Sequence, residues 1–200
     1  MKKLLFALLL FYNVSYSQSA AGVWYFGNQA GINFNLGSNP VALFDSQMQT
    51  FEGCATLCDD FGTLLFYTDG LSIWNKNHVL MPNGTGLLGD SSSTQSAIIV
   101  PMPGSTTKYY VFTVTELAKP SGLRYNIVDM TLEGGTGDVI TKNIALLTPT
   151  AEKINVVKHA NDNDYWVISH KFNNSEFYAY LISPAGISAP VISSVGEIIG

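Results

Sequence analysis

The sequence predicts an all-β protein, a partial β-propeller of about three four-stranded blades. A short apolar run that ends in a hydroxyl residue occurs at residues 64–68 (LLFYT), 109–113 (YYVFT) and 165–169 (YWVIS). Each run is aromatic-rich or β-branched and does not alternate with polar residues, which is typical of a strand buried on both faces. The runs recur at intervals of roughly 45 to 55 residues, near the ~40–50 residues of a propeller blade. The 18 glycines, 12% aromatic and 12% charged residues also fit a turn-rich β-protein.

Residues 1–17 have the pattern of an export signal. Two lysines precede an apolar run at residues 4–12, and a Ser-Tyr-Ser stretch follows. The run is too short for the ~20 residues that cross a bilayer, so no transmembrane segment is expected. We therefore expect residues 18–200 to form a secreted, extracellular protein displayed at the outer cell surface.

The first elements after the signal are a predicted strand pair. Residues 23–26 and 32–35 are apolar-rich and are joined by a glycine-containing loop. In propellers an N-terminal piece of this kind completes the last blade, which removes exposed strand edges. The pair is therefore interpreted as ring-closing.

The first blade is predicted from residue 53 onward. Its strands lie at 53–57, 64–68 (the inner strand) and 71–74, and the Asp-Asp-Phe-Gly sequence at 59–62 suits a tight hairpin. The segment 75–94 is expected to be a long loop with room for the outer strand.

The next two blades follow the same order. Blade two has predicted strands at 97–100, 109–113, 123–130 and 139–146, and blade three at 154–157, 165–169, 176–182 and 191–195. Propellers have about four to eight blades, so three cannot close a ring. We interpret residues 18–200 as the truncated N-terminal part of a larger propeller.

The only cysteines are Cys54 and Cys58. On a straight strand they would lie ~13 Å apart at ~3.3 Å per residue, whereas a disulfide needs Cα atoms within about 7 Å. Two interpretations stay open: two small buried hydrophobic side chains, or a local bridge with a turn at Thr56. Two thiols without a matching histidine pair predict no zinc site.

The charge balance argues against nucleic-acid binding. The formal net charge is -5 and Arg124 is the only arginine. A protein that neutralises phosphates needs clustered lysine or arginine. Nucleic acid is therefore not expected as a partner.

Candidate site residues come from aligning the three repeats. The alignment puts Asp69, Val114 and His170 at one position, just beyond the buried strand. In a propeller this position borders the central channel, so Asp69 and His170 are candidate ligand-binding residues in a shared pocket. Alternatively, Asp69 makes a turn with its following glycine and His170 ends a strand. The other histidines, His78 and His159, stand elsewhere in the blades.

No cofactor or metal site is predicted. The acidic stretch at residues 161–164 offers oxygen ligands for calcium but lacks the glycine and the distal glutamate of an EF-hand loop. A solvated hairpin tip is the preferred interpretation of this stretch.

An ordered set of short motifs covers essentially the whole expected mature chain. The motifs are 24–27 (WYFG), 52–56 (EGCAT), 66–70 (FYTDG), 74–75 (WN), 81–84 (MPNG), 93–101 (STQSAIIVP), 128–130 (VDM), 147–153 (LTPTAEK) and 165–170 (YWVISH). This set resembles the N-terminal propeller of large surface proteins from gliding bacteria. That family carries a C-terminal sorting domain for type IX secretion and is described as gliding-motility-associated. The resemblance implies the type IX machinery as a partner, through a C-terminal domain missing from residues 18–200, and supplies no catalytic residues.

These observations favour a non-enzymatic, adhesive binding module whose partner is an extracellular glycan or protein. The alternative is a glycan-active enzyme, a hydrolase or lyase, whose active site is completed by blades missing from this chain. Later channel-facing arginines or paired carboxylates in the full-length gene would favour the enzyme. Adhesive modules and a sorting domain would favour display.

Overall fold

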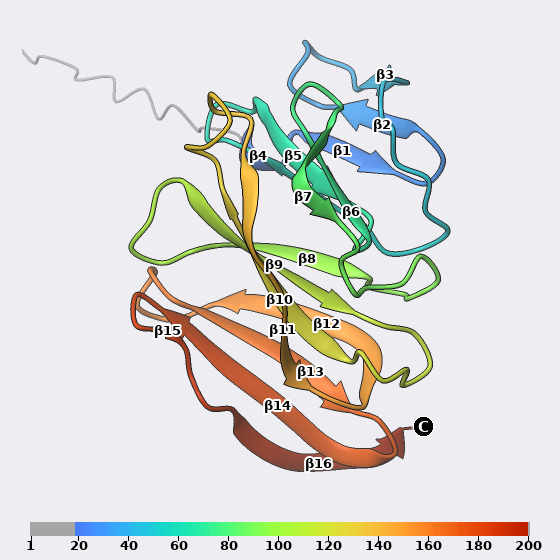
Figure 1. The fold of residues 1–200 in the computed structure, drawn as a ribbon, viewed down its shortest axis with the longest axis vertical. Helices are drawn as coiled ribbons and strands as arrows, with labels where there is room; N and C mark the ends of the chain where they lie inside the picture. Colours follow the sequence, from blue (N-terminus) through green and yellow to red (C-terminus); the bar gives the residue numbers. More distant parts are fainter. Residues whose placement is uncertain (1–18, 200) are drawn as a thin grey trace, which may run out of the picture.

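A computed structural model describes residues 19–199 as an all-β protein of four antiparallel sheets (Figure 1). The single helical element among these residues is a short 3-10 turn, η1 (Ser19–Ala21). The expected export signal at residues 1–17 lies outside the described residues. Within residues 19–199 no helix has the length and apolar character to cross a membrane. The all-β prediction is confirmed.

The first sheet has one strand more than the predicted pair. It consists of β1 (Val23–Phe26), β2 (Ala30–Asn33) and β3 (Val41–Leu43). An isolated bridge from Asn28 to Gln49 adds a further contact at its edge. The sheet therefore has a third strand beyond the predicted pair, and the bridge fixes residue 49 beside the β1–β2 turn.

The other three sheets run in chain order, and their strands lie close to the predicted ranges, although the fourth sheet has five strands instead of four. The second sheet is β4 (Ala55–Cys58), β5 (Leu64–Thr68), β6 (Ser72–Asn75) and β7 (Leu80–Thr85). The third sheet is β8 (Ala97–Pro101), β9 (Lys108–Val114), β10 (Leu123–Asp129) and β11 (Asp138–Leu147). The fourth sheet is β12 (Thr150–Lys158), β13 (Tyr165–Lys171), β14 (Asn174–Ser183), β15 (Gly186–Ile187) and β16 (Val191–Ile199), the last two both paired with β14.

The repeated apolar run is the second strand of each of the last three sheets. β5, β9 and β13 each lie between two hydrogen-bonded neighbours, and β4, β8 and β12 precede them. These first strands contact one another from sheet to sheet. Burial on both faces holds for the end of β5 and most of β9, whereas Trp166 and Ile168 of β13 are only half-buried. They face away from the third sheet, where no further sheet covers them among residues 19–199.

The sheets stack face to face in chain order, with a hydrophobic core between each neighbouring pair (Figure 1). Successive residues of a strand point to opposite faces. Accordingly, Phe66 of β5 lies in the core with the third sheet, and Tyr67 lies in the core with the first. Because Phe66 and Tyr67 enter different cores, β5 packs the second sheet against the third sheet on one face and against the first sheet on the other.

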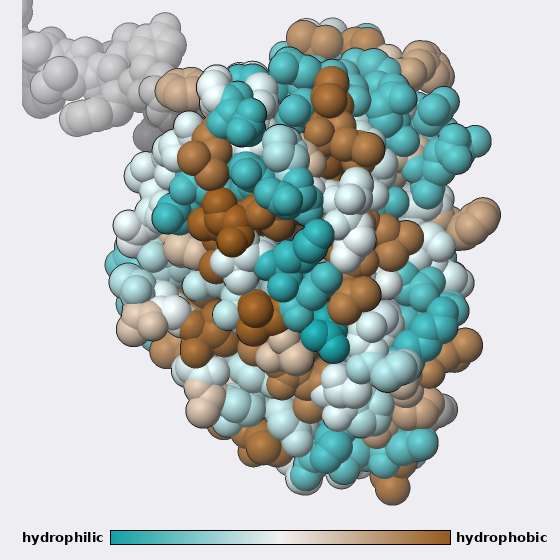
Figure 2. Space-filling model, in the orientation of Figure 1, coloured by the Kyte–Doolittle hydropathy of each residue, from teal (hydrophilic) through white to brown (hydrophobic). Residues whose placement is uncertain are grey.

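Apolar side chains also remain in contact with solvent. Figure 2 shows hydrophobic patches among hydrophilic ones on the visible face. Phe44 and Phe51, which follow the first sheet in the chain, are 84% and 89% exposed. In the fourth sheet β16 exposes Val191, Ile192 and Val195. Both ends of the stack therefore carry uncovered apolar surface.

Candidate functional site

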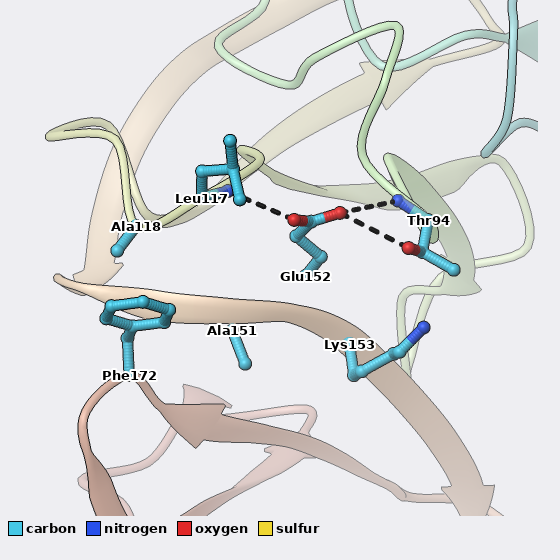
Figure 3. Close-up of a pocket in the computed structure, with 7 residues that line it drawn as sticks. All are labelled: Thr94, Leu117, Ala118, Ala151, Glu152, Lys153 and Phe172. Atoms are coloured by element: carbon cyan, nitrogen blue, oxygen red, sulfur yellow. Dashed lines mark hydrogen bonds between the residues drawn. The ribbon is translucent and has the colours of Figure 1, made fainter. Parts of the chain in front are cut away.

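A cavity of about 260 Å³ opens between the third and fourth sheets (Figure 3). Four segments build it: the β7–β8 connection, the β9–β10 loop, the start of β12 and the β13–β14 turn. Its lining residues are Thr94, Leu117, Ala118, Ala151, Glu152, Lys153 and Phe172. Most of this lining is apolar, with one acidic and one basic side chain.

Glu152 ties three of these segments together. Its Oε1 accepts a hydrogen bond from the backbone N of Leu117 at 3.1 Å. Its Oε2 accepts from the backbone N and from Oγ1 of Thr94, both at 3.2 Å. Burial alone would raise the pKa of this carboxyl, but the Leu117 and Thr94 donors outweigh it and hold the pKa below its usual value. The carboxylate is therefore charged at neutral pH and already engaged, which suits positioning rather than proton transfer.

The β9–β10 loop reaches Glu152 in a strained backbone conformation. Leu117 and Ala118 have φ angles of 44° and 53°, in the left-handed region that non-glycine residues rarely adopt. Such strain costs of order 1–3 kcal/mol per residue and is concentrated at functional sites. The Glu152 bond to Leu117 helps to hold this conformation.

The side chains of the cavity that are not already hydrogen-bonded determine which ligand it can bind. Leu117, Ala118, Ala151 and Phe172 offer apolar surface. Figure 3 shows Phe172 and Ala118 at one end of the hollow and Lys153 at the other. An apolar surface with a few convergent polar groups is typical of a binding site. The cavity suits a ligand with an apolar face and a hydrogen-bond acceptor or negative group.

Asp69 makes a turn, which was the alternative interpretation of this residue. Its Oδ1 accepts from the backbone N of Leu71 at 2.8 Å and of Ser72 at 2.7 Å. The side chain is buried, and this burial raises the pKa of the carboxyl although the Ser72 and Leu71 donors oppose the shift. Asp69 therefore begins the β5–β6 turn from a buried position.

His170 lines a different cavity, of about 190 Å³, and Asp69 is not among the residues lining it. Ser96 Oγ donates to the backbone O of Asp69 at 2.7 Å, whereas the preceding Gln95 lines the His170 cavity. Val114, the third aligned residue, is buried in the core between the third and fourth sheets. The three equivalent positions thus have three different environments.

The other histidines are bound into local structure. His78 Nε2 lies 3.4 Å from Asp45 Oδ2, and His78 Nδ1 lies 3.3 Å from the Tyr67 hydroxyl. His159 Nδ1 accepts from the backbone N of Asn161 at 3.1 Å in the β12–β13 hairpin tip. Within residues 19–199 no group of three or more His, Cys, Asp or Glu side chains is arranged to hold a metal ion.

Both cysteines are free thiols beside the first sheet. Cys58 is buried in the core between the first two sheets, and Cys54 is half-buried with Sγ 3.4 Å from the backbone O of Tyr25. Burial raises the pKa of both thiols. The two cysteines are therefore small, mostly buried side chains and do not form a reactive pair.

Sequence reasoning missed Glu152 and Phe172 as site residues. The partners of Glu152 lie 35 and 58 positions away in the chain, so no local pattern marks it. An isolated glutamate at the start of a β-strand is the one signal that could have drawn attention, because glutamate is depleted in strands.

Comparison with protein-family models, with curated proteins and with solved structures finds no match to this chain. The resemblance to gliding-associated surface propellers therefore stays a prediction. The site has to be interpreted from its own geometry.

Proposed function

We propose that this chain is a secreted or cell-surface β-propeller module that binds an extracellular glycan or protein without chemically changing it. The Glu152 cavity carries the proposal. Its carboxylate is occupied by three donors, and its free lining is apolar surface with one ammonium group. A general acid or base needs a free carboxyl or imidazole within reach of its substrate. The free groups of this cavity suit binding instead.

The stacking of the sheets supports a propeller. Each of the last three sheets is a meander in chain order, and the first strands β4, β8 and β12 meet one another. Radial repetition of four-stranded sheets around their first strands is the arrangement of propeller blades. We further propose that these sheets belong to a larger ring and that a sorting domain for type IX secretion directs the whole protein to the cell surface, as the family resemblance suggests.

A binding screen with matched variants tests the proposal. Wild-type protein is applied to immobilised polysaccharides, oligosaccharides and extracellular proteins, and captured ligands are re-measured with Phe172→Ala. Phe61→Ala is the control, because Phe61 is exposed in the β4–β5 turn, at the opposite end of the sheets. We expect Phe172→Ala to weaken binding at least tenfold and Phe61→Ala to leave it unchanged, with equal melting temperatures. No captured ligand, or turnover of a captured glycan, would overturn the proposal.

A further inference from the structure

A second cavity lies at the β12 edge of the fourth sheet, where Gln95 of the β7–β8 connection meets the strands β12, β13 and β14. Side chains alternate along β13, so Val167 enters the core while Ile168 and His170 share the other face. In the strand register Asn155 of β12 lies opposite Ile168, and Phe177 of β14 lies opposite His170. These four side chains from three adjacent strands line the cavity of about 190 Å³.

The imidazole of His170 lacks hydrogen-bond partners in this cavity. The residue is only 4% exposed, and neither ring nitrogen has a partner among residues 19–199. Phe177 stands edge-on to the imidazole, with ring centroids 4.5 Å apart and planes at 78°, and offers no acceptor. His78 and His159, by contrast, each have a partner at Nδ1. Buried polar groups are nearly always hydrogen-bonded, so an unpartnered imidazole beside a cavity points to a missing ligand.

The remaining polar groups of the cavity are mainly donors. Gln95 Oε1 accepts from the backbone N of Ile154 at 3.1 Å, and Asn155 Oδ1 accepts from the backbone N of Val156 at 2.8 Å. Each amide therefore keeps its NH₂ group as a donor, and Lys153, which also lines the cavity, is donor-only. A ligand for this cavity must be rich in acceptor oxygens.

The imidazole adds a second requirement. A neutral imidazole has one N–H donor and one bare acceptor nitrogen. A carboxylate only accepts, so it satisfies one nitrogen of a neutral imidazole, whereas neighbouring hydroxyls accept from one nitrogen and donate to the other. Ile168 and Phe177 supply apolar surface for the C–H groups of a ring. Hydroxyls around a partly apolar ring are the chemistry of a sugar.

We propose that the His170 cavity is a sugar-binding site, with His170 contacting adjacent hydroxyls and Phe177 packing on the ring. The assignment goes beyond the Glu152 cavity, since it rests on different side chains and on its own unpartnered group. Lys153 lines both cavities. The two cavities are therefore neighbours along β12.

The test observes the imidazole nitrogens directly. Protein labelled with ¹⁵N is titrated with glucose, galactose, mannose, N-acetylglucosamine or glucuronate at millimolar concentration, and with acetate and phosphate as anion probes. Long-range ¹H–¹⁵N spectra report each histidine separately. We expect at least one sugar to shift both ring nitrogens of His170 while those of His159 stay unchanged. Shifts with acetate or phosphate but no sugar, or no shift with any probe, would overturn the proposal.

Two variants separate binding from folding. His170→Phe replaces the unpartnered imidazole by an apolar ring, so we expect an equal or higher melting temperature and at least tenfold weaker sugar binding. Asn155→Trp obstructs the cavity from an exposed position and is expected to weaken binding equally. His159→Phe is the matched control. Unchanged sugar affinity in both cavity variants would refute the site. If Phe172→Ala alone lowers binding, the proposed function stands and only the His170 assignment fails.

Discussion

Replacing the buried Asn126 by alanine should destabilise the protein strongly. Asn126 lies on β10 with no exposed surface. Its Nδ2 donates to the backbone O of Val111 on β9 at 3.0 Å, and its Oδ1 accepts from the backbone N of Asn143 on β11 at 2.8 Å. The pairing of β10 with β11 shifts register between Tyr125 and Ile127. The side chain therefore bridges a bulge where the strand ladder itself is interrupted.

The bridge also supports the contact between two sheets. Asn143 has a φ of 62° and directs its side chain to the second sheet. Its Nδ2 donates to the backbone O of Gly86 at 3.0 Å, and its Oδ1 accepts from the backbone N of Leu88 at 3.0 Å. Because Asn126 holds the backbone N of Asn143, losing Asn126 frees Asn143 to rotate away from the second sheet.

The expected magnitude follows from the groups left without partners. Asn126→Ala leaves the backbone N of Asn143 without its acceptor, which costs about 1–3 kcal/mol. The backbone O of Val111 loses only a second donor, because Val111 stays paired with β10 in the strand ladder. A loss of ~2 kcal/mol is a large part of the ~5–15 kcal/mol that stabilises a domain. With an m-value of ~2 kcal/mol per molar urea, the unfolding midpoint should fall by roughly 1 M.

Urea unfolding followed by tryptophan fluorescence measures this change. Asn163→Ala is the control, because Asn163 is exposed in the β12–β13 hairpin tip and its bonds to Asn161 are open to water. We expect the control to change stability by less than about 0.5 kcal/mol. A loss below ~1 kcal/mol for Asn126→Ala, with an unchanged m-value, would refute the account of the bridge.

Three further predictions concern a glycine, a carboxylate and the apolar ends. Gly70→Ala places a Cβ against Ser96 Oγ at a φ of 86°, so we expect a loss above ~2 kcal/mol and a clearly lower melting temperature. The pKa of Glu152 is lowered in the folded protein, so its stabilisation is present above the unfolded pKa of ~4.3 and is lost as pH falls through the folded value. The difference in unfolding free energy between wild type and Glu152→Gln should therefore shrink from pH 7 to pH 3, and a constant difference would contradict this. The 200-residue chain should associate reversibly in sedimentation velocity, and Phe44→Glu with Phe51→Glu should shift it toward monomer.

The strands were predictable because burial and turn chemistry leave local signals. The apolar run at residues 64–68 marks β5, the glycine-containing turn at 59–62 precedes it, and the Asp69-Gly70 turn ends it. The strand β3 (Val41–Leu43) was not predicted, since it is short and its side chains are mostly exposed. Its place depends on pairing with β2, which no pattern in its own residues reveals.

The candidate site was only partly predictable for the same reason. Aligning the repeats selected His170, which lines a cavity, but placed it in one pocket with Asp69, which does not line that cavity. The alignment could not distinguish the environments of its three members: Asp69 makes a turn, Val114 enters a core, and His170 is buried without a partner. Glu152 depends on two loops that meet only when the third and fourth sheets stack.

The meander explains why both cavities lie at one end of the sheets. Adjacent strands of a meander are antiparallel, so the second strand ends beside the start of the first. The turn from the second strand into the third therefore lies at the same end of the sheet as the connection that arrives from the preceding sheet. Leu117 and Phe172 come from such turns, and Thr94 and Glu152 come from connections or strand starts. The opposite ends hold turns such as the β12–β13 tip, whose polar groups bond within the turn. At the cavity end, the β7–β8 connection and the β9–β10 loop come from different parts of the chain and meet at one place. A ligand that spans both cavities therefore contacts two neighbouring sheets at once, and added sheets of the same kind would extend this surface at the same end.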